Sequence, residues 1–357
     1  MPVKLGFVGA GAVAQMCHIA NFVEIADCRA VALAELRPEL GRAAAAKFGI
    51  PRVYSTHREL LADPEVDAVV VVTRQAATGA VVLDALRAGR HVLSEKPMAH
   101  TLDQARLLAA EAQARDLRYA VGFMKRHDAA VQYAHSLLER YRATGELGPL
   151  AFVRAYCFTG HDGRDGTGFV MTPEERTVGL QAWPTAPDWL PEELHAEYEL
   201  FLNVNSHDLN LLRYLLDGTP TVTGADLSRP LGKHVALDFG NCGGILEFGN
   251  TSLGEWNEGV EVYFARGVLR IAFPAPFVRQ AARVEISTDD GRAQSVLPSF
   301  NERWSFRRQA EAFVKDVATG AEPLAGGADG VADLALAEEI WRLHLQTMHR
   351  TRPPVLS

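Results

Sequence analysis

The stretch that decides the fold is VKLGFVGAGAVA, residues 3–14. It combines a short apolar strand, a glycine turn and the start of a helix, the pattern of a dinucleotide-binding βα unit. Gly9 permits the tight turn, and Gly11 lets the backbone approach a pyrophosphate at the helix N-terminus. Ala12 and Val13 follow this turn and are predicted to bind the same group. Ala14 stands where a small residue allows close packing of helix on strand. The simpler alternative is a strand–helix turn with no ligand.

The next predicted strand ends in an acid, Glu35, which follows Gly9 by 26 residues. A carboxylate near this spacing is expected to bind the ribose hydroxyls of the adenosine, and it repels a 2′-phosphate. This favours NAD over NADP. Arg37 weakens the preference, because an arginine there could contact a 2′-phosphate, although it could instead lie over the adenine.

The composition limits the class of protein. At 357 residues we expect roughly two domains, and a hydrophobic content of 48% is ample for packed cores. A net charge of −8 without a basic cluster argues against nucleic acid as a partner. No apolar run reaches the roughly 18 residues that span a bilayer, and no signal peptide precedes the first strand. The four scattered cysteines have no metal-ligand spacing, so we predict reduced thiols, no metal site and a cytoplasmic protein.

The pattern of elements changes after residue 123. Residues 1–123 alternate apolar strands with helical segments, which predicts a doubly wound parallel sheet, a Rossmann domain. Residues 124–357 contain strand-like segments separated by turns, which predict a large, open, mostly antiparallel sheet in an α+β domain. Two closing helices, 304–319 and 330–349, are expected to pack back toward the Rossmann domain. The second domain is expected to bind substrate and to mediate oligomerisation.

A second motif, HVLSEKP at residues 91–97, ends the predicted fifth strand. Ligands of open α/β sheets bind beyond the carboxyl ends of strands, so Glu95 and Lys96 are predicted to lie at the cofactor. Lys96 could also donate a hydrogen bond to a substrate oxygen and stabilise a developing alkoxide. The alternative is a surface lysine next to a proline.

A third motif begins at Asn203 and continues as a leucine-rich helix to residue 216. On such a helix Asn203 and His207 are one turn apart and project to one side. His207 could act as a general base on a hydroxyl, because its unperturbed pKa lies near working pH. The alternative is a structural histidine.

Together these motifs resemble the glucose–fructose oxidoreductase / inositol dehydrogenase family of NAD(P)-dependent dehydrogenases, over essentially the whole chain. The resemblance rests on residues 9–11, 88–97, 122–128, 206–208 and 313–320. It implies a Rossmann domain followed by an open-sheet domain, and oxidation or reduction of a secondary alcohol on a sugar or cyclitol. It also implies that Lys96 and His207 are catalytic and that the Lys96-Pro97 bond is cis.

Two departures from the family pattern matter. Many cyclitol dehydrogenases have an aspartate where this chain has Asn203; an amide orients His207 but does not stabilise an imidazolium by charge. The base could therefore be weaker, or Lys96 could carry more of the proton transfer. Thr73 and Arg74, predicted beside the nicotinamide, begin a segment where relatives commonly have proline after the threonine.

The segment 160–200 carries nine acidic and two arginine side chains, a formal charge of −7. An acidic cleft attracts cations, which suggests an amino-bearing sugar or aminocyclitol of the kind met in aminoglycoside pathways. The alternative is a solvated acidic surface loop. Substrate contacts are predicted for Asp162 in this segment and for Lys125 and Arg126, although Arg126 could instead hold the domain junction.

The sequence therefore predicts an NAD-dependent dehydrogenase of a sugar, aminosugar or cyclitol ring hydroxyl. Lys96 and His207 handle the proton, Asn203 is the third predicted catalytic residue, and all three also bind the small-molecule substrate. Two alternatives stay open: a glycosidase that uses NAD for transient oxidation, and a non-enzymatic dinucleotide-sensing regulator. An open sheet with an exposed face predicts a homodimer or homotetramer.

Overall fold

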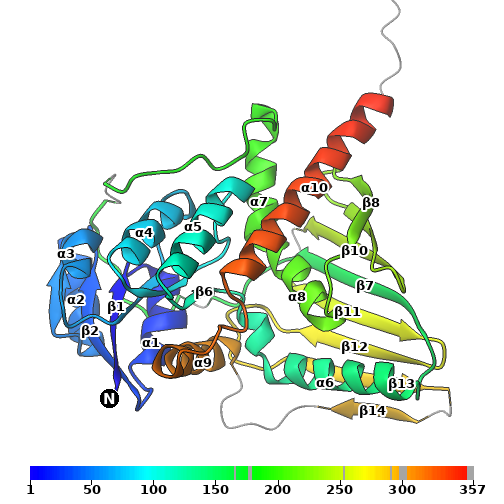
Figure 1. The fold of residues 1–357 in the computed structure, drawn as a ribbon, viewed down its shortest axis with the longest axis horizontal. Coiled ribbons are helices and arrows are strands. Elements are labelled where there is room, and N and C mark those ends of the chain that lie inside the picture. Colours follow the sequence, from blue (N-terminus) through cyan, green and yellow to red (C-terminus); the bar gives the residue numbers. More distant parts are fainter. Residues whose placement is uncertain (165, 176–178, 252–253, 290–291, 297–303, 352–357) are drawn as a thin grey trace, which may run out of the picture. The chain divides into compact units, whose positions relative to one another are not determined.

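A computed structural model describes the chain except for residues 165, 176–178, 252–253, 290–291, 297–303 and 352–357 (Figure 1). The chain forms two compact units, neither of them continuous in sequence. The first contains 1–124, 165–203 and 306–334, and the second contains 125–164, 204–305 and 335–357. The expected boundary after residue 123 therefore marks only the first of several crossings between the units.

The first unit is built on a six-stranded parallel sheet with the order β3-β2-β1-β4-β5-β6, which confirms the predicted Rossmann architecture. Its strands are β1 Val3–Val8, β2 Cys28–Ala34, β3 Arg52–Tyr54, β4 Ala68–Val71, β5 His91–Ser94 and β6 Tyr119–Val121. The helices between them include α1 Ala20–Phe22, α2 Pro38–Phe48, α3 His57–Leu61, α4 Gln75–Arg87 and α5 Leu102–Ala114. The strand order reverses beside β1, between β2 and β4, which is where ligands bind in such sheets.

The sheet of this unit is covered on both faces. Every residue of β4 is buried, as its unbroken run of alanine and valine predicts. Phe22 and Phe313 are at most 1% exposed, and their rings pack edge to face 6.4 Å apart. Phe313 belongs to α9, Ser305–Thr319, so a helix from near the end of the chain helps to close the core around β1.

The second unit is built on an eight-stranded sheet with the order β14-β13-β12-β11-β7-β10-β9-β8. The strands are β7 Leu150–Thr159, β8 Thr221–Asp226, β9 Lys233–Asp238, β10 Gly243–Asn250, β11 Asn257–Phe264, β12 Gly267–Phe273, β13 Arg283–Thr288 and β14 Ala293–Val296. Neighbours run antiparallel apart from the parallel pair β7 and β10. The prediction of a mostly antiparallel open sheet is thereby confirmed.

Helices α6 Ala129–Thr144 and α8 Ser206–Leu216 pack against this second sheet. The long helix α10, Gly327–Thr351, begins in the first unit and passes into the second at residue 335. Within the described part of the chain, no helix has both the length and the apolar character needed to cross a membrane.

Candidate functional site

The glycine turn after β1 has the geometry that its residues predict. Gly9 has a φ of +99°, and a Cβ at this position would lie 2.2 Å from the carbonyl oxygen of Val72. Only glycine therefore fits there. A Cβ on Gly11, in contrast, would meet no described atom within 4 Å. Packing does not require this second glycine, but a phosphate group that approached the backbone would, so the turn fits a dinucleotide.

The helix after the turn departs from the expected regular α-helix. Residues Ala14–Ile19 form wide π-type turns before α1 begins at Ala20. Gln15 lies in these turns, is fully buried and donates from Nε2 to the carbonyl oxygen of Ala10 at 2.7 Å. Turns of this type are frequent at functional sites.

Glu35 lies directly after β2 and is only 8% exposed. Its Oε2 accepts a hydrogen bond from the Ala10 amide at 2.8 Å, which ties the end of β2 to the glycine turn. The Arg37 guanidinium donates to both carboxylate oxygens, from Nε at 2.9 Å and from Nη2 at 3.1 Å. The predicted acid and the predicted arginine therefore form one ion pair beside the turn.

Two predicted site residues, Lys96 and Asn203, are in direct contact within the first unit. The ammonium of Lys96 donates to the backbone carbonyl of Asn203 and, at 3.0 Å, to its side-chain Oδ1. Gln75, at the start of α4, donates to the same Oδ1 at 2.8 Å. The Asn203 amide is thereby oriented with its oxygen toward both donors. Gln75 and its contact were not predicted from the sequence.

Glu95 positions the strand end from which Lys96 projects. Its Oε1 lies 2.7 Å from Nε2 of His18, and its Oε2 accepts the Lys96 amide at 3.2 Å. Burial raises the pKa of the Glu95 carboxyl, but the His18 hydrogen bond and the nearby charges outweigh burial and leave this pKa below its ordinary value. A carboxylate therefore persists behind Lys96. The peptide bond between Lys96 and Pro97 is cis, as the family resemblance implies.

Thr73 and Arg74 connect β4 to α4 at the same edge of the sheet. The Thr73 hydroxyl lies 3.0 Å from the Thr78 hydroxyl, and Arg74 is the residue that precedes the first turn of α4. The indole of Trp183 packs directly on Gly79, where a Cβ would lie 2.4 Å from its ring. Trp183 thus covers the first turns of α4.

The continuous helix expected from Asn203 to residue 216 is interrupted. Helix α7, His195–Val204, ends one residue after Asn203, and α8 begins at Ser206. The intervening Asn205 is the N-cap residue of α8, and its Nδ2 donates to the Asp208 carboxylate at 3.1 Å. Asn203 belongs to the first unit and His207, which is 9% exposed, to the second. The convergence of Lys96 and His207 on one ligand stays a prediction.

The predicted substrate residues of the second unit are engaged within that unit. Lys125 is buried and pairs with the equally buried Glu258. Arg126 donates from Nη2 to the carbonyl of Asn210 at 3.1 Å and lies over the ring of Tyr214. These contacts give Lys125 and Arg126 structural roles, and their contact with substrate stays a prediction.

Asp162 and a buried cluster are further charged groups of the second unit. Asp162 forms an ion pair with Arg164 at 2.6 Å. Cys157, Asp208 and Glu258 bring three ligand-type atoms within 4.8 Å of one another. Burial raises the pKa of Asp208 above its ordinary value, and the nearby charge of Lys125 only partly opposes this. Lys125 supplies the positive charge of this cluster.

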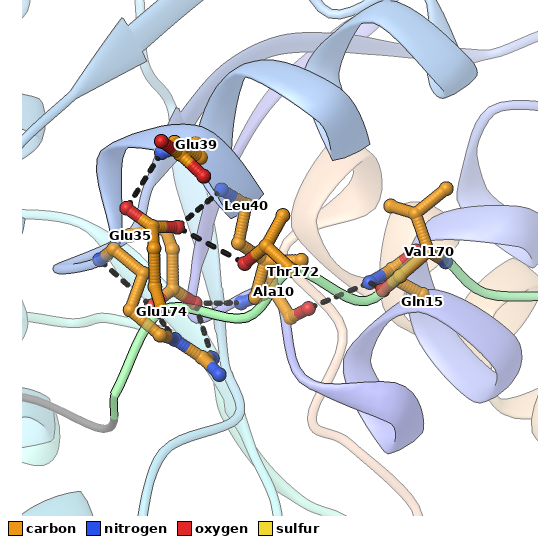
Figure 2. A network of polar contacts seen from close by, with 9 residues as sticks. Ala10, Gln15, Glu35, Glu39, Leu40, Val170, Thr172 and Glu174 are labelled. Carbon is orange, nitrogen blue, oxygen red and sulfur yellow. Dashed lines mark hydrogen bonds and ion pairs between the residues drawn. The ribbon is translucent and has the colours of Figure 1, made fainter.

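A network that sequence reasoning missed connects the segment after residue 165 to the nucleotide-binding turn (Figure 2). Gln15 exchanges two hydrogen bonds with the backbone of Val170, and Glu174 accepts the amides of Glu39 and Leu40. Nothing in the local sequence indicates these partners, which lie 134 to 155 positions apart.

The fold and this site define a class, namely two-domain oxidoreductases that bind a nicotinamide dinucleotide. Comparison with known proteins supports this assignment to a class. Residues 3–123 match the model of the oxidoreductase family with an NAD-binding Rossmann fold. Residues 3–123 thus belong to this family, and the chain is an oxidoreductase, as the family resemblance predicts.

Its relatives include dehydrogenases and reductases of polyhydroxylated rings. A myo-inositol 2-dehydrogenase from Thermotoga maritima is 24% identical over 350 residues, 94% of each chain. A 1,5-anhydro-D-fructose reductase from Ensifer adhaerens is 27% identical over 341 residues, 93% of each chain. The structure of a 3-ketoreductase from Actinomadura kijaniata in complex with NADP and TDP-benzene superimposes with a TM-score of 0.76 at 20% identity, covering 96% of this chain and 98% of that one.

Proposed function

We propose that this oxidoreductase is an NAD-dependent dehydrogenase that oxidises or reduces a secondary ring hydroxyl of a sugar, aminosugar or cyclitol. The observation that carries the proposal is the ammonium of Lys96, held by Asn203 at the carboxyl end of β5. This is the edge of the sheet at which the glycine turn also lies. A cation at this edge is suited to a substrate oxygen that gains negative charge during the reaction.

Different residues of the chain bind the cofactor, stabilise charge on the substrate and take the proton. The nicotinamide supplies the hydride chemistry when it is bound. The turn residues Gly9, Gly11, Ala12 and Val13 approach the pyrophosphate, with Thr73, Arg74 and Glu95 lining the sheet edge. Lys96 donates a hydrogen bond to the substrate oxygen and stabilises its negative charge, while His207 takes the hydroxyl proton. Asn203 orients Lys96 through the contact at Oδ1.

The preference for NAD rests on Glu35. Its buried carboxylate lies where adenosine ribose hydroxyls are bound in Rossmann domains, and a negative charge there repels a 2′-phosphate. The Arg37 guanidinium already donates to both oxygens of Glu35, so these donors do not serve a phosphate. This pairing supports neither the phosphate contact nor the adenine contact left open for Arg37, and it gives the residue a structural role instead.

Substrate charge is a finer part of the proposal. The acidic segment favours an amino-bearing ring, although several of its acids have internal partners: Asp162 pairs with Arg164, and Glu199 accepts the hydroxyl of Thr185. Comparing an amino sugar with its neutral hydroxyl analogue tests this part. A higher kcat/KM for the amino compound supports it, and equal values contradict it.

Self-association is also proposed. One face of the second sheet carries ion pairs between strands, in which Arg154 contacts Glu247 at 2.6 Å and Glu261 at 3.4 Å. Phe152 on the same strand is 39% exposed, so this face combines charged and apolar groups suited to a second copy. Light scattering coupled to size-exclusion chromatography should give the mass of a dimer or tetramer, and a monomer mass would contradict this.

The central test replaces Lys96 by alanine. With a panel of polyols and NAD, Lys96→Ala should lower kcat by about 10²–10⁴-fold while NADH still binds. Lys315→Ala, which removes an exposed lysine on α9, should leave both unchanged. An active Lys96→Ala enzyme would contradict the role. A native chain that binds NAD and produces no NADH with any polyol would contradict the dehydrogenase proposal.

A further inference from the structure

A segment from beyond β7 is attached along the nucleotide-binding edge of the first unit. The amide of Val170 donates to Oε1 of Gln15 at 2.9 Å, and Nε2 of Gln15 donates back to the Val170 carbonyl at 3.0 Å (Figure 2). Two residues earlier, the carbonyl of Gly168 accepts from Lys47 at 2.6 Å. Gln15 stands just after the glycine turn, so the segment is fixed beside the predicted pyrophosphate site.

The same segment places a carboxylate at the N-terminus of α2. Glu174 accepts the amide of Glu39 at Oε1, 2.9 Å away, and the amide of Leu40 at Oε2, 2.8 Å away (Figure 2). The Thr172 hydroxyl donates to Oε2 at 3.0 Å. Helix α2 has no side-chain cap from Arg37, the residue that precedes it. Glu174 therefore supplies from a distance the negative cap that this helix end favours.

The local contacts of Glu174 favour the ionised form of its carboxylate. Burial raises the pKa of Glu174, but the hydrogen bonds from Glu39, Leu40 and Thr172 outweigh burial, and the positive charge of Arg37 acts in the same direction. The pKa thus lies below its ordinary value, and Glu174 is ionised at neutral pH.

The place that Glu174 occupies is the one an NADP phosphate needs. In a Rossmann domain the adenosine ribose lies at the end of β2, where an arginine nearby accommodates a 2′-phosphate. The free amides of a helix N-terminus are the other natural phosphate donors. Here Arg37 is paired with Glu35, and the α2 amides are paired with Glu174.

We propose that Glu174 is a specificity-determining residue that excludes NADP, because its carboxylate holds the α2 amides and repels a 2′-phosphate. This inference rests on the proposed NAD-dependent function. It assigns part of the nucleotide preference to a residue far outside the glycine-turn region, whereas Glu35 contacts the ribose hydroxyls. Discrimination of this kind works by a repulsive element against the wrong ligand.

The test compares the dissociation constants of NADH and NADPH by fluorescence titration of the full chain. In Glu174→Ala the ratio of the NADPH Kd to the NADH Kd should fall by about tenfold or more, since the like-charge repulsion is removed and the two α2 amides become available as donors. Glu174→Gln, which keeps one acceptor oxygen and loses the charge, should give a smaller fall. Glu175→Ala is the matched control, because it removes an exposed neighbouring acid and should leave the ratio unchanged.

The outcomes separate the inference from the proposed function. An unchanged ratio in both Glu174 variants, with NADH still bound, overturns the inference and leaves the proposed function standing. An equal fall in Glu175→Ala also overturns it, because the effect would then be one of general charge. A native chain that binds NADPH as tightly as NADH overturns it directly. A native chain that binds neither nucleotide overturns the proposed function itself. Glu174→Gln keeps the test decisive if Glu174→Ala does not fold.

Discussion

The sheet edge and the segment 166–203 contribute to the same unit in different ways. At the edge, Gly9 and Glu35 follow a strand directly and Lys96 follows one after a single residue, so the strand that precedes a residue also positions it. In the segment, Val170 and Glu174 reach their partners across 155 and 134 positions of sequence. Residues at the edge are those expected to bind the nucleotide. Residues in the segment form hydrogen bonds with the side chain of Gln15 and with the first amides of α2. Sequence motifs therefore locate the site, while its boundary is set by contacts that no motif contains.

Replacing Gly9 tests the edge and has the largest expected effect. Gly9→Ala places a Cβ 2.2 Å from the Val72 carbonyl at a φ of +99°, so we expect a loss of about 3 kcal/mol or more in the free energy of unfolding. Gly11→Ala is the matched control, since its Cβ meets no described atom within 4 Å. It should change stability by less than about 1 kcal/mol and still weaken NADH binding. Urea unfolding and NADH titration measure both, and equal destabilisation of the two variants would contradict this account of the turn.

Replacing Gln15 tests the segment. Its amide makes hydrogen bonds to Ala10 and, in both directions, to Val170, so Gln15→Ala leaves the buried Ala10 carbonyl and the partly buried backbone groups of Val170 without these partners. We expect a loss of about 2 kcal/mol in the free energy of unfolding, with faster hydrogen exchange at the Val170 amide. Gln113→Ala, an exposed position on α5, should change neither quantity. If Val170 stays protected in Gln15→Ala, the attachment of the segment does not depend on this pair.

The smallest effect is a dependence on pH. The pKa of Glu174 is lowered in the folded chain from an ordinary value of 4.5. Its contribution is therefore fully present above that pH and is lost as the pH falls through the lowered folded value. The amides of Glu39 and Leu40 should lose hydrogen-exchange protection on acidification before the rest of α2. In Glu174→Gln this acid-dependent step should disappear, and its persistence would assign the step to another group.

Local pattern explains why much of the fold was predictable. The unbroken apolar run of β4 predicts a buried strand, and the glycine pattern after β1 predicts a tight turn, each from a few residues. The placement of Lys96 follows from the end of β5. The break at Asn205 was not predicted, because the leucine spacing of residues 206–216 predicts a helix but does not indicate the residue at which that helix begins. Asn203 contacts Lys96 and Gln75. These contacts depend on tertiary packing, which the periodicity of the sequence does not encode.

The discontinuity of the first unit has a consequence for biosynthesis. The amide of Val121 on β6 donates to the carbonyl of Ala325, and Phe313 fills the core around β1. Ala325 follows Val121 by 204 residues, and Phe313 follows Val8, the end of β1, by 305 residues. The nascent nucleotide-binding unit therefore leaves the ribosome with an uncovered apolar surface and finishes folding only when residue 334 has emerged. A fragment cut after the sixth strand would retain every glycine of the motif and still lack its final packing layer.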